Sequence, residues 1–263
     1  DMDLIQEALI LSDNISDDLL VLDGYKFVTD YQQIFKQKGV KIACIDDIHA
    51  YKFLADVVIN HAGGLHKSDY SGDANTKYFL GPQYALLNKA FREAARSRNA
   101  EKPNANNLFI CLGGADPFNQ TLDVLKLLSN EDKIYCHIVL GSANLNHNTL
   151  HQYVIETGIN AKFYQNIDST QMVELMGKCG AGICSPSTIS YEFLSVGFLL
   201  FLIQTADNQI DMFNFLLKEQ LAFDFKTDFK NRNQINLSSL FGRVSKVFDG
   251  KQANRIIEIF EKI

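Results

Sequence analysis

Short apolar runs alternate with amphipathic segments along almost all of the 263 residues. The runs 19–22, 41–45 and 56–59 have the length and composition of strands. The segment 31–38, between the first two runs, has a helical pattern and ends at Gly39, a residue type that commonly closes helices. Strands that alternate with helices form parallel sheets covered on both faces. The alternation therefore predicts an α/β fold.

The alternation continues to the end of the chain. Further strands are predicted at 78–80, 108–112, 134–140, 161–164, 180–184 and 198–203. Helices are predicted at 86–96, 118–129, 146–156, 169–177, 187–196 and 208–219, followed by two C-terminal helices. Residues 61–77 have the glycine, serine and asparagine content of a long loop, and 97–107 (SRNAEKPNANN) have the composition of a linker.

Two blocks of this kind predict two Rossmann-type parallel-sheet domains with a cleft between them. The N-terminal domain is expected over 1–98, the C-terminal domain over 107–250, and a final helix over 251–263. Ligands of parallel α/β sheets bind beyond the carboxyl ends of the strands. The strand-to-helix turns are therefore the places where a site is expected.

Bulk properties exclude several classes of function. A net charge of −6 disfavours nucleic acid as a partner, because binding to a phosphate backbone requires a positive field. The longest uncharged apolar stretch, 193–206, is shorter than the ~20 residues that cross a bilayer, so no membrane span is expected. The segment DMDLIQEALI carries acids where a secretory signal carries positive charge. Five cysteines without a CxxC pair are typical of reduced thiols, which predicts a cytoplasmic protein.

The first candidate turn is Gly113-Gly114-Ala115-Asp116, which is followed by Pro117. Two glycines allow the backbone to approach a ligand closely, and free amides at a helix start favour a phosphate. The alternative is a tight turn in which Asp116 caps the helix. The sequence leaves both interpretations open.

The second candidate turn contains Ser187 and Thr188, with Glu192 one helical turn further on. A carboxylate at that position can accept two hydrogen bonds from a ribose diol. The alternative is a serine cap and a solvated glutamate. Glu192 is the only charged residue between 179 and 206, and an acid in such apolar surroundings usually needs a partner.

Two further turns carry polar side chains. After the most apolar strand come Asn208 and Gln209, whose amides suit sugar hydroxyls and acetamido groups, unless Asp207 simply caps the next helix. In the first block, Asp23 and Tyr25 are expected to face the other turns across the cleft. Taken alone, Tyr25 is better explained as a partly buried aromatic residue.

No metal site or other cofactor is expected. Potential metal ligands occur at Asp46, Asp47, His49, His61 and His66, but their spacing matches no compact metal-binding motif. The six histidines also show no order that indicates a Ser/His/Asp triad.

Several segments together resemble one known family in order and spacing. They are VLDGYKFVTDYQQIFKQKGVKIACIDD, ADVVIN, LGPQYALLNKAF, LFICLGGADPFNQTL, STISYEF and DNQ. They resemble the UDP-2,4-diacetamido-2,4,6-trideoxy-β-L-altropyranose hydrolase of pseudaminic acid biosynthesis (PseG), which is related to MurG-like GT-B glycosyltransferases. The resemblance implies a GT-B-like fold whose N-terminal domain is incomplete in this chain, because the family's opening strand and Gly-x-Gly-His loop have no counterpart.

The resemblance also implies roles for residues of the four turns. A UDP-sugar would bind with its nucleotide on the C-terminal domain, and its ribose would contact Glu192. The diphosphate would contact Gly113, Gly114, Ser187 and Thr188. Ala115 and Asp116 of the glycine turn are also expected to contact the substrate. Asn208 and Gln209 would approach the diphosphate or the sugar, and the backbone around Ile167 would face the uracil. Tyr25 and Asp23 would lie at the reacting centre, with Asn60 nearby.

The implied reaction is attack of water on the anomeric carbon, which releases UDP and the free diacetamido-trideoxyhexose. The family's catalytic histidine lies in its Gly-x-Gly-His loop. Two alternatives remain: a GT-B glycosyltransferase that uses the same donor with a sugar or lipid acceptor, and a non-catalytic protein that binds a nucleotide-sugar.

Overall fold

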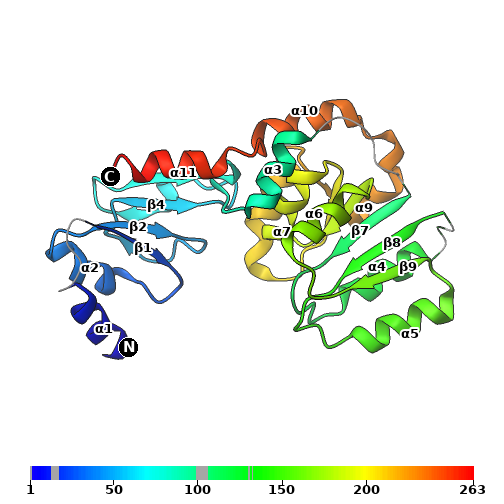
Figure 1. Ribbon diagram of the computed structural model, residues 1–263, viewed down its shortest axis with the longest axis horizontal. Helices are drawn as coiled ribbons and strands as arrows, with labels where there is room; N and C mark the ends of the chain where they lie inside the picture. Colours follow the sequence, from blue (N-terminus) through cyan, green and yellow to red (C-terminus); the bar gives the residue numbers. More distant parts are fainter. Residues whose placement is uncertain (1, 13–17, 99–105, 130, 132) are drawn as a thin grey trace. The chain divides into compact units, whose positions relative to one another are not determined.

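The computed structural model describes residues 2–12, 18–98, 106–129, 131 and 133–263. Its strands pair in parallel throughout, which confirms the predicted α/β class. The chain divides into two compact units (Figure 1). The first comprises residues 1–86 and 251–263, and the second comprises residues 87–250.

The first unit is built on a four-stranded sheet with the order β1-β2-β4-β6. Its strands are β1 (Leu19–Asp23), β2 (Lys41–Ile45), β4 (Val57–Asn60) and β6 (Lys77–Leu80), and a separate two-stranded sheet joins β3 (Lys52–Phe53) to β5 (Ser71–Gly72). Its helices are α1 (Met2–Ser12), α2 (Thr29–Gln37) and α11 (Gln252–Phe260), with short 3-10 turns η1 (Lys67–Asp69) and η2 (Pro82–Tyr84). The main-sheet strands are close to their predicted positions because each is a continuous apolar run.

Helix α11 belongs to the first unit, although the sequence predicted 251–263 as a separate C-terminal helix. Ile256 and Ile259 are buried in one cluster with Ala43, Val57 and Ile59 of the sheet. In Figure 1, α11 (red) runs along the sheet that contains β2 and β4. The reason is the apolar stripe on one side of the helix, which needs an apolar surface to cover it.

Replacing Ile259 with alanine is expected to destabilise the first unit by about 2–4 kcal/mol, because the change leaves a cavity between α11 and the sheet. Urea unfolding followed by circular dichroism would measure the loss. Ile257→Ala is the matched control, since Ile257 lies on the same helix but is 55% exposed. Equal destabilisation by the two variants would contradict the assignment of α11 to this unit.

The second unit contains a six-stranded sheet with the order β12-β11-β10-β7-β8-β9. The strands are β7 (Asn107–Cys111), β8 (Tyr135–Val139), β9 (Ala161–Tyr164), β10 (Ala181–Cys184), β11 (Leu200–Leu202) and β12 (Phe223–Asp224). The helices are α3 (Lys89–Ser97), α4 (Gln120–Leu128), α5 (His147–Thr157), α6 (Ser169–Gly177), α7 (Thr188–Val196), α8 (Ile210–Lys218), α9 (Phe225–Asp228) and α10 (Leu237–Val247), and two 3-10 turns are η3 (Asp207–Gln209) and η4 (Phe229–Gln234). Strands β10 and β7 are buried in the centre of the sheet.

The boundary between the units falls at residue 86 and not at the predicted residue 98. Helix α3 joins the second unit because it packs against α6 and α7 there. The Arg96 Nε donates to the Gly250 carbonyl oxygen at 3.0 Å. Arg98 donates to the carbonyl oxygens of Leu194, Gly197 and Phe248, which lie close to the end of α7 and the end of α10. Burial lowers the pKa of Arg98 to about 10, so its guanidinium is still charged at neutral pH.

Most predicted elements after residue 107 lie within a few residues of the observed ones, and the predicted helix 169–177 coincides with α6. The structure adds α1, α9 and the short strands β3, β5 and β12. The short strands have only two residues each, too few for a periodic pattern. The segment 61–77, predicted as a loop, contains β5 and η1. Residues 99–105 of the predicted linker lie outside the described residues.

Within the described part of the chain, no helix is long and apolar enough to cross a membrane. All five cysteines are buried and unpaired.

Candidate functional site

The turns after β7 and β10 lie next to each other, because these two strands are neighbours in the sheet. Cys111, the last residue of β7, pairs in register with Cys184, the last residue of β10. A Cβ atom placed on Gly113 would lie 3.6 Å from the Ser185 Oγ. The first and second candidate turns are therefore brought together at one edge of the six-stranded sheet, which we call the carboxyl edge.

The two glycines of the first turn have different surroundings. Gly113 has a φ of +93°, a region that strongly favours glycine. Gly114 is exposed, and a Cβ atom added to it would meet nothing within 4 Å. A Cβ atom on Gly141, in the loop after β8, would overlap the backbone of Gly114. One face of the Gly114 backbone is therefore covered by Gly141, and another is open to a ligand.

Asp116, predicted to contact the substrate, has a side chain that is engaged within its own turn. Its side chain is buried, with one oxygen accepting from the Gln120 N–H at 2.8 Å and the other from the Thr121 N–H at 2.9 Å. A carboxylate already neutralises the positive end of α4, so a phosphate is not expected there. The free amides of this turn belong to Gly114 and Ala115, for which no acceptor is found among the described residues.

The start of α7, unlike that of α4, has no side-chain cap. Ser187 precedes the helix, but its hydroxyl lies 3.1 Å from the Ser185 Oγ and makes no capping hydrogen bond. Thr188 is exposed, and in the described structure its N–H and that of Ile189 have no acceptor. The α7 N-terminus can therefore bind an anion through free N–H groups and the helix dipole.

Glu192 lies one turn into α7 and is half-buried. Burial raises its pKa to about 7, and among the described residues its carboxylate has no hydrogen-bond or ion-pair partner. Burial also raises the pKa of Cys111 to about 11, and the charge of Glu192 contributes to that rise. The carboxylate is therefore close to the end of β7 and is available to accept hydrogen bonds from a ligand.

Gln209, predicted to contact the ligand, makes hydrogen bonds within its own loop. Its Oε1 accepts from the Thr205 N–H at 2.8 Å and from the Ala206 N–H at 3.3 Å. Asn208 is exposed, and its side chain has no hydrogen bond to the described part of the chain. The third turn therefore offers Asn208 to a ligand, whereas the Gln209 amide is already engaged.

Ile167 lies in the loop after β9, at the same edge of the sheet as the other turns. The side chain is half-buried, and the next residue, Asp168, caps α6 by accepting from the Gln171 N–H at 2.8 Å. Strand β8 separates β9 from β7, so this loop is further from the glycine turn than the loop after β10 is.

The fourth turn, in the first unit, borders a cavity of about 200 Å³ at the carboxyl ends of β1, β2 and β4. Its lining includes the polar residues Asp23, Tyr25, Asp46, Asp47, Tyr51 and His61. Tyr25 is 61% exposed, and its hydroxyl donates to Asp47 Oδ2 at 2.8 Å. This hydrogen bond is the main cause of the raised pKa of Tyr25.

Asn60, predicted to lie near the substrate, is fully buried and is not among the residues that line this cavity. Its Nδ2 donates to Asp46 Oδ2 at 3.2 Å and to the Tyr70 hydroxyl at 2.8 Å, and its Oδ1 accepts from the Ala62 N–H. The Tyr70 hydroxyl donates to the same Asp46 oxygen at 2.9 Å. Asn60 therefore holds together the loops that follow β2 and β4.

The sequence interpretation missed His61, Asp46 and Asp47 as residues of this cavity, because it considered them only as metal ligands. For His61 there was a further signal. It follows β4 directly, so its position at a carboxyl strand end was the available signal. Burial lowers its pKa, and the charges of Asp47 and Asp23 partly oppose this effect. No group of three or more potential metal ligands is found in the described part of the chain.

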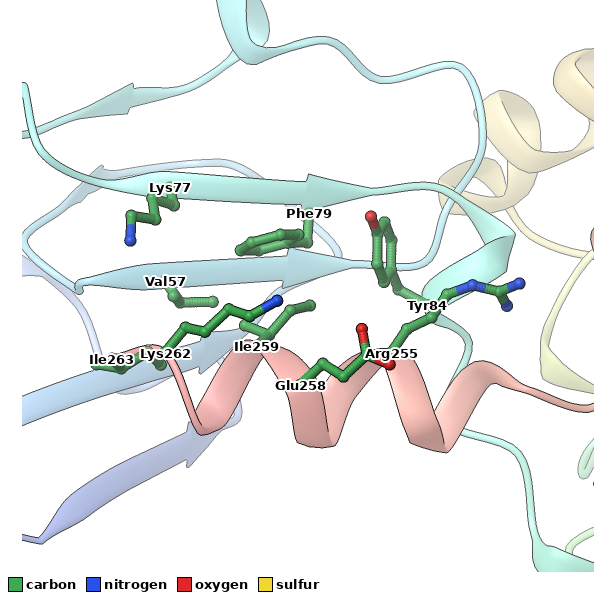
Figure 2. Close-up of a pocket in the computed structure, with 9 residues that line it drawn as sticks. All are labelled: Val57, Lys77, Phe79, Tyr84, Arg255, Glu258, Ile259, Lys262 and Ile263. Atoms are coloured by element: carbon green, nitrogen blue, oxygen red, sulfur yellow. The ribbon is translucent and has the colours of Figure 1, made fainter.

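A second cavity of about 200 Å³ lies between α11 and the sheet of the first unit (Figure 2). Figure 2 shows Val57 and Phe79 on the sheet side and Ile259 on the helix side. Val57 and Lys77 are the first residues of β4 and β6, so this cavity extends to the amino ends of these strands. Since ligands of parallel sheets bind at the carboxyl ends, we interpret it as a packing gap beneath α11.

No protein-family model matches the chain. The uncharacterized protein MJ1062 of Methanocaldococcus jannaschii is 30% identical over 221 residues, which are 78% of this chain and 44% of that protein. The spore coat polysaccharide biosynthesis protein SpsG of Bacillus subtilis is 29% identical over 163 residues, 59% of this chain and 45% of SpsG. The chain thus spans less than half the length of these relatives.

Among solved structures, MurG of Acinetobacter baumannii matches with a TM-score of 0.62 and 12% identity, covering 100% of this chain and 79% of MurG. The pneumococcal O-GlcNAc transferase GtfA, solved with UDP and GlcNAc, matches with a TM-score of 0.56 and 9% identity, covering 98% of this chain and 59% of GtfA. TarM matches with a TM-score of 0.54 and 11% identity, covering 98% of this chain and 58% of TarM. The chain has the α/β fold of GT-B glycosyltransferases.

Proposed function

We propose that this chain binds a UDP-sugar and cleaves the bond between the sugar and UDP. One observation carries the proposal: in the described part of the chain, a helix start at α7 without a side-chain cap, an open glycine at 114 and a half-buried Glu192 without a partner lie at one edge of the sheet. The similarity of the fold to GtfA, which was solved with UDP, supports the same ligand class. The relationship to SpsG supports a role in polysaccharide biosynthesis.

In the proposed complex, the diphosphate accepts hydrogen bonds from N–H groups of Gly114, Ala115 and Thr188. Free amides and a helix N-terminus favour such an anion without any basic side chain. The ribose hydroxyls donate to Glu192, and the uracil lies against the backbone near Ile167. Negative charge builds up on the diphosphate as UDP departs, and the loss of one preorganised donor at such a position typically costs about 3 kcal/mol of barrier height.

Glycosyl transfer is the outcome that the comparisons favour, because the fold is that of glycosyltransferases. An acceptor hydroxyl then attacks the anomeric carbon while UDP leaves. Hydrolysis is the second candidate. The segments LGPQYALL and GGADPFN support it, because they resemble the PseG family, in which water is the attacking group.

The test is to incubate the 263-residue chain with UDP-N-acetylglucosamine or with UDP-2,4-diacetamido-2,4,6-trideoxy-β-L-altropyranose, and to quantify UDP. The proposal predicts that UDP is released, either with an added sugar acceptor or with water alone. Release that requires the acceptor indicates transfer, and release without it indicates hydrolysis. UDP binding without any release would contradict the enzymatic part of the proposal and would leave a binding protein.

For hydrolysis, water labelled with heavy oxygen shows which bond breaks. Label in the free sugar means cleavage between the anomeric carbon and oxygen, as proposed. Label in UDP means cleavage between phosphorus and oxygen, which would contradict attack at the anomeric carbon.

A further inference from the structure

A groove of about 570 Å³ lies between helix α5 and strand β9, which is the edge strand of the six-stranded sheet. Its lining includes His147 and His151 of the helix and Phe163 of the strand. The described residues that line it all belong to the second unit and differ from the residues assigned to the UDP-sugar. The groove is therefore a separate feature of this unit.

His147 and His151 are four positions apart in α5, so their side chains lie on the same side of the helix. Their ring centres are 4.3 Å apart, and the ring planes are inclined by 39°. Two imidazoles bound at a right angle to one metal ion have ring centres roughly 4.5 Å apart, given a metal–nitrogen distance of about 2.0–2.1 Å. The two rings therefore have nearly the spacing of two ligands of one ion. This pair was not among the potential ligands considered from the sequence, although its spacing was visible there.

Both histidine rings are available to a ligand. They are half-buried, and among the described residues neither ring has a hydrogen-bond or ion-pair partner. Phe163 stacks on the His151 ring with the ring centres 4.0 Å apart, a contact that limits the rotation of this histidine. Burial and the neighbouring His147 lower the pKa of His151, which favours the neutral ring that binds metal ions.

Lys162 is the one lysine or arginine among the described residues that line the groove. Successive side chains of a strand point to opposite faces of the sheet. Because Phe163 contacts His151, the Lys162 side chain lies on the other face, where its Nζ is 5.2 Å from the centre of the Tyr164 ring. Its charge therefore does not directly oppose a cation bound by the two histidines.

We propose that His147 and His151 together bind one divalent transition-metal ion, whose coordination is completed by water. Imidazole nitrogen suits Zn²⁺, Ni²⁺ and Cu²⁺, and Cu²⁺ is expected to bind most tightly of the three. The ion joins two successive turns of α5, a helix in which Leu150 is the only buried residue among those described. Since the spacing of the pair requires the helix to be formed, metal binding stabilises α5. This inference does not depend on the proposed function.

The first test is a calorimetric titration of the intact chain with Cu²⁺. His147→Gln and His151→Gln are each expected to weaken the binding of Cu²⁺ by at least about tenfold, because losing a ligand costs more than losing an outer-shell partner, which typically costs 10–100-fold. His66→Gln is the control, since His66 is an exposed histidine of the first unit, and it is expected to bind Cu²⁺ as wild type does. The electron paramagnetic resonance spectrum of Cu²⁺ on the wild-type chain is expected to show coupling to two nitrogen atoms. Wild-type affinity in His147→Gln or His151→Gln, or coupling to fewer than two nitrogen atoms, would overturn the inference.

The second test locates the effect of the metal in the fold. Hydrogen exchange followed by mass spectrometry is expected to show that Zn²⁺ slows amide exchange in α5 of the wild-type chain. In His151→Gln, Zn²⁺ is expected to leave the exchange of α5 unchanged. Equal slowing in the two proteins, or no slowing in wild type, would show that the ion does not join the turns of α5. If the chain fails to bind UDP while both metal results hold, the proposed function fails and the metal site stands.

Discussion

Replacing Gly114 with alanine is expected to weaken UDP binding by about tenfold or more, which is a loss of at least ~1.4 kcal/mol of binding free energy. The free energy of unfolding is expected to stay unchanged. The added Cβ atom meets no protein atom within 4 Å, so the folded state accommodates it. In the complex, however, the methyl group would occupy the space through which the diphosphate approaches the amides of Gly114 and Ala115. Isothermal titration calorimetry and urea unfolding would measure the two quantities.

Gly141→Ala is the matched comparison, because its Cβ atom would overlap the backbone of Gly114. We expect this variant to lose about 3 kcal/mol of stability, since neighbouring backbones must separate to make room. If the Gly114→Ala variant binds UDP as tightly as wild type, the diphosphate does not approach this turn. Gly141→Ala that is as stable as wild type would show that the two loops are not packed in this way.

The affinity of the wild-type chain for UDP is expected to rise about tenfold between pH 6 and pH 8, beyond any change that comes from UDP itself. The reason is that Glu192, with a pKa of about 7, is mostly protonated at the lower pH and mostly ionised at the higher one. Only the ionised form accepts hydrogen bonds from both ribose hydroxyls. Glu192→Gln is expected to lose this contribution and to bind UDP at least about tenfold more weakly at pH 8. Calorimetric titrations of wild type and Glu192→Gln with UDP at each pH would measure the effect. The ionisation of UDP affects both proteins equally, so it cancels in the ratio of their affinities.

Stability is expected to change in the opposite direction. The pKa of Glu192 is higher in the folded chain than in the unfolded chain, so its ionisation disfavours the folded state as the pH rises through about 7. Glu192→Gln removes this cost. The difference in free energy of unfolding between the variant and wild type should therefore favour the variant more at pH 8 than at pH 5. Glu174→Gln is the control, because Glu174 is an exposed residue of α6. It should change neither the affinity for UDP nor the pH dependence of stability. A variant that keeps the wild-type pH dependence of UDP binding would remove Glu192 from the nucleotide site.

Much of the secondary structure of both units could be predicted because its signals are local. Helix α6 begins after Asp168, whose side chain forms a capping box with Gln171, and the predicted and observed bounds agree. Helix α2 is followed by Gly39 with a φ of +79°. Such motifs involve residues a few positions apart and act before any tertiary contact forms.

The division into units could not be predicted from composition. Helix α3 precedes the residues with linker composition, yet it packs on α6 and α7 of the second unit. Helix α11 lies at the end of the chain, yet it covers the first sheet through Ile256 and Ile259. Both assignments depend on apolar contacts with residues that are distant in the sequence.

The candidate site residues, too, could be predicted only in part from the sequence. The sequence located the strand-to-helix turns, because the strand ends could be predicted. It could not decide which side chains are free. Asp116 and Gln209 bind amides of their own loops, and Asn60 joins the loops after β2 and β4 through Asp46 and Tyr70.

The amino-acid sequence by itself determined the α/β class and the positions of most strands, helices and turns, because periodicity and turn residues act over short distances. The tertiary structure alone decided that β10 lies beside β7, that Glu192 is half-buried with no partner among the described residues, and that His61 shares a cavity with Asp23 and Asp47. The physical reason is that strand order, burial and electrostatic environment depend on which distant segments pack together, and no local pattern encodes them.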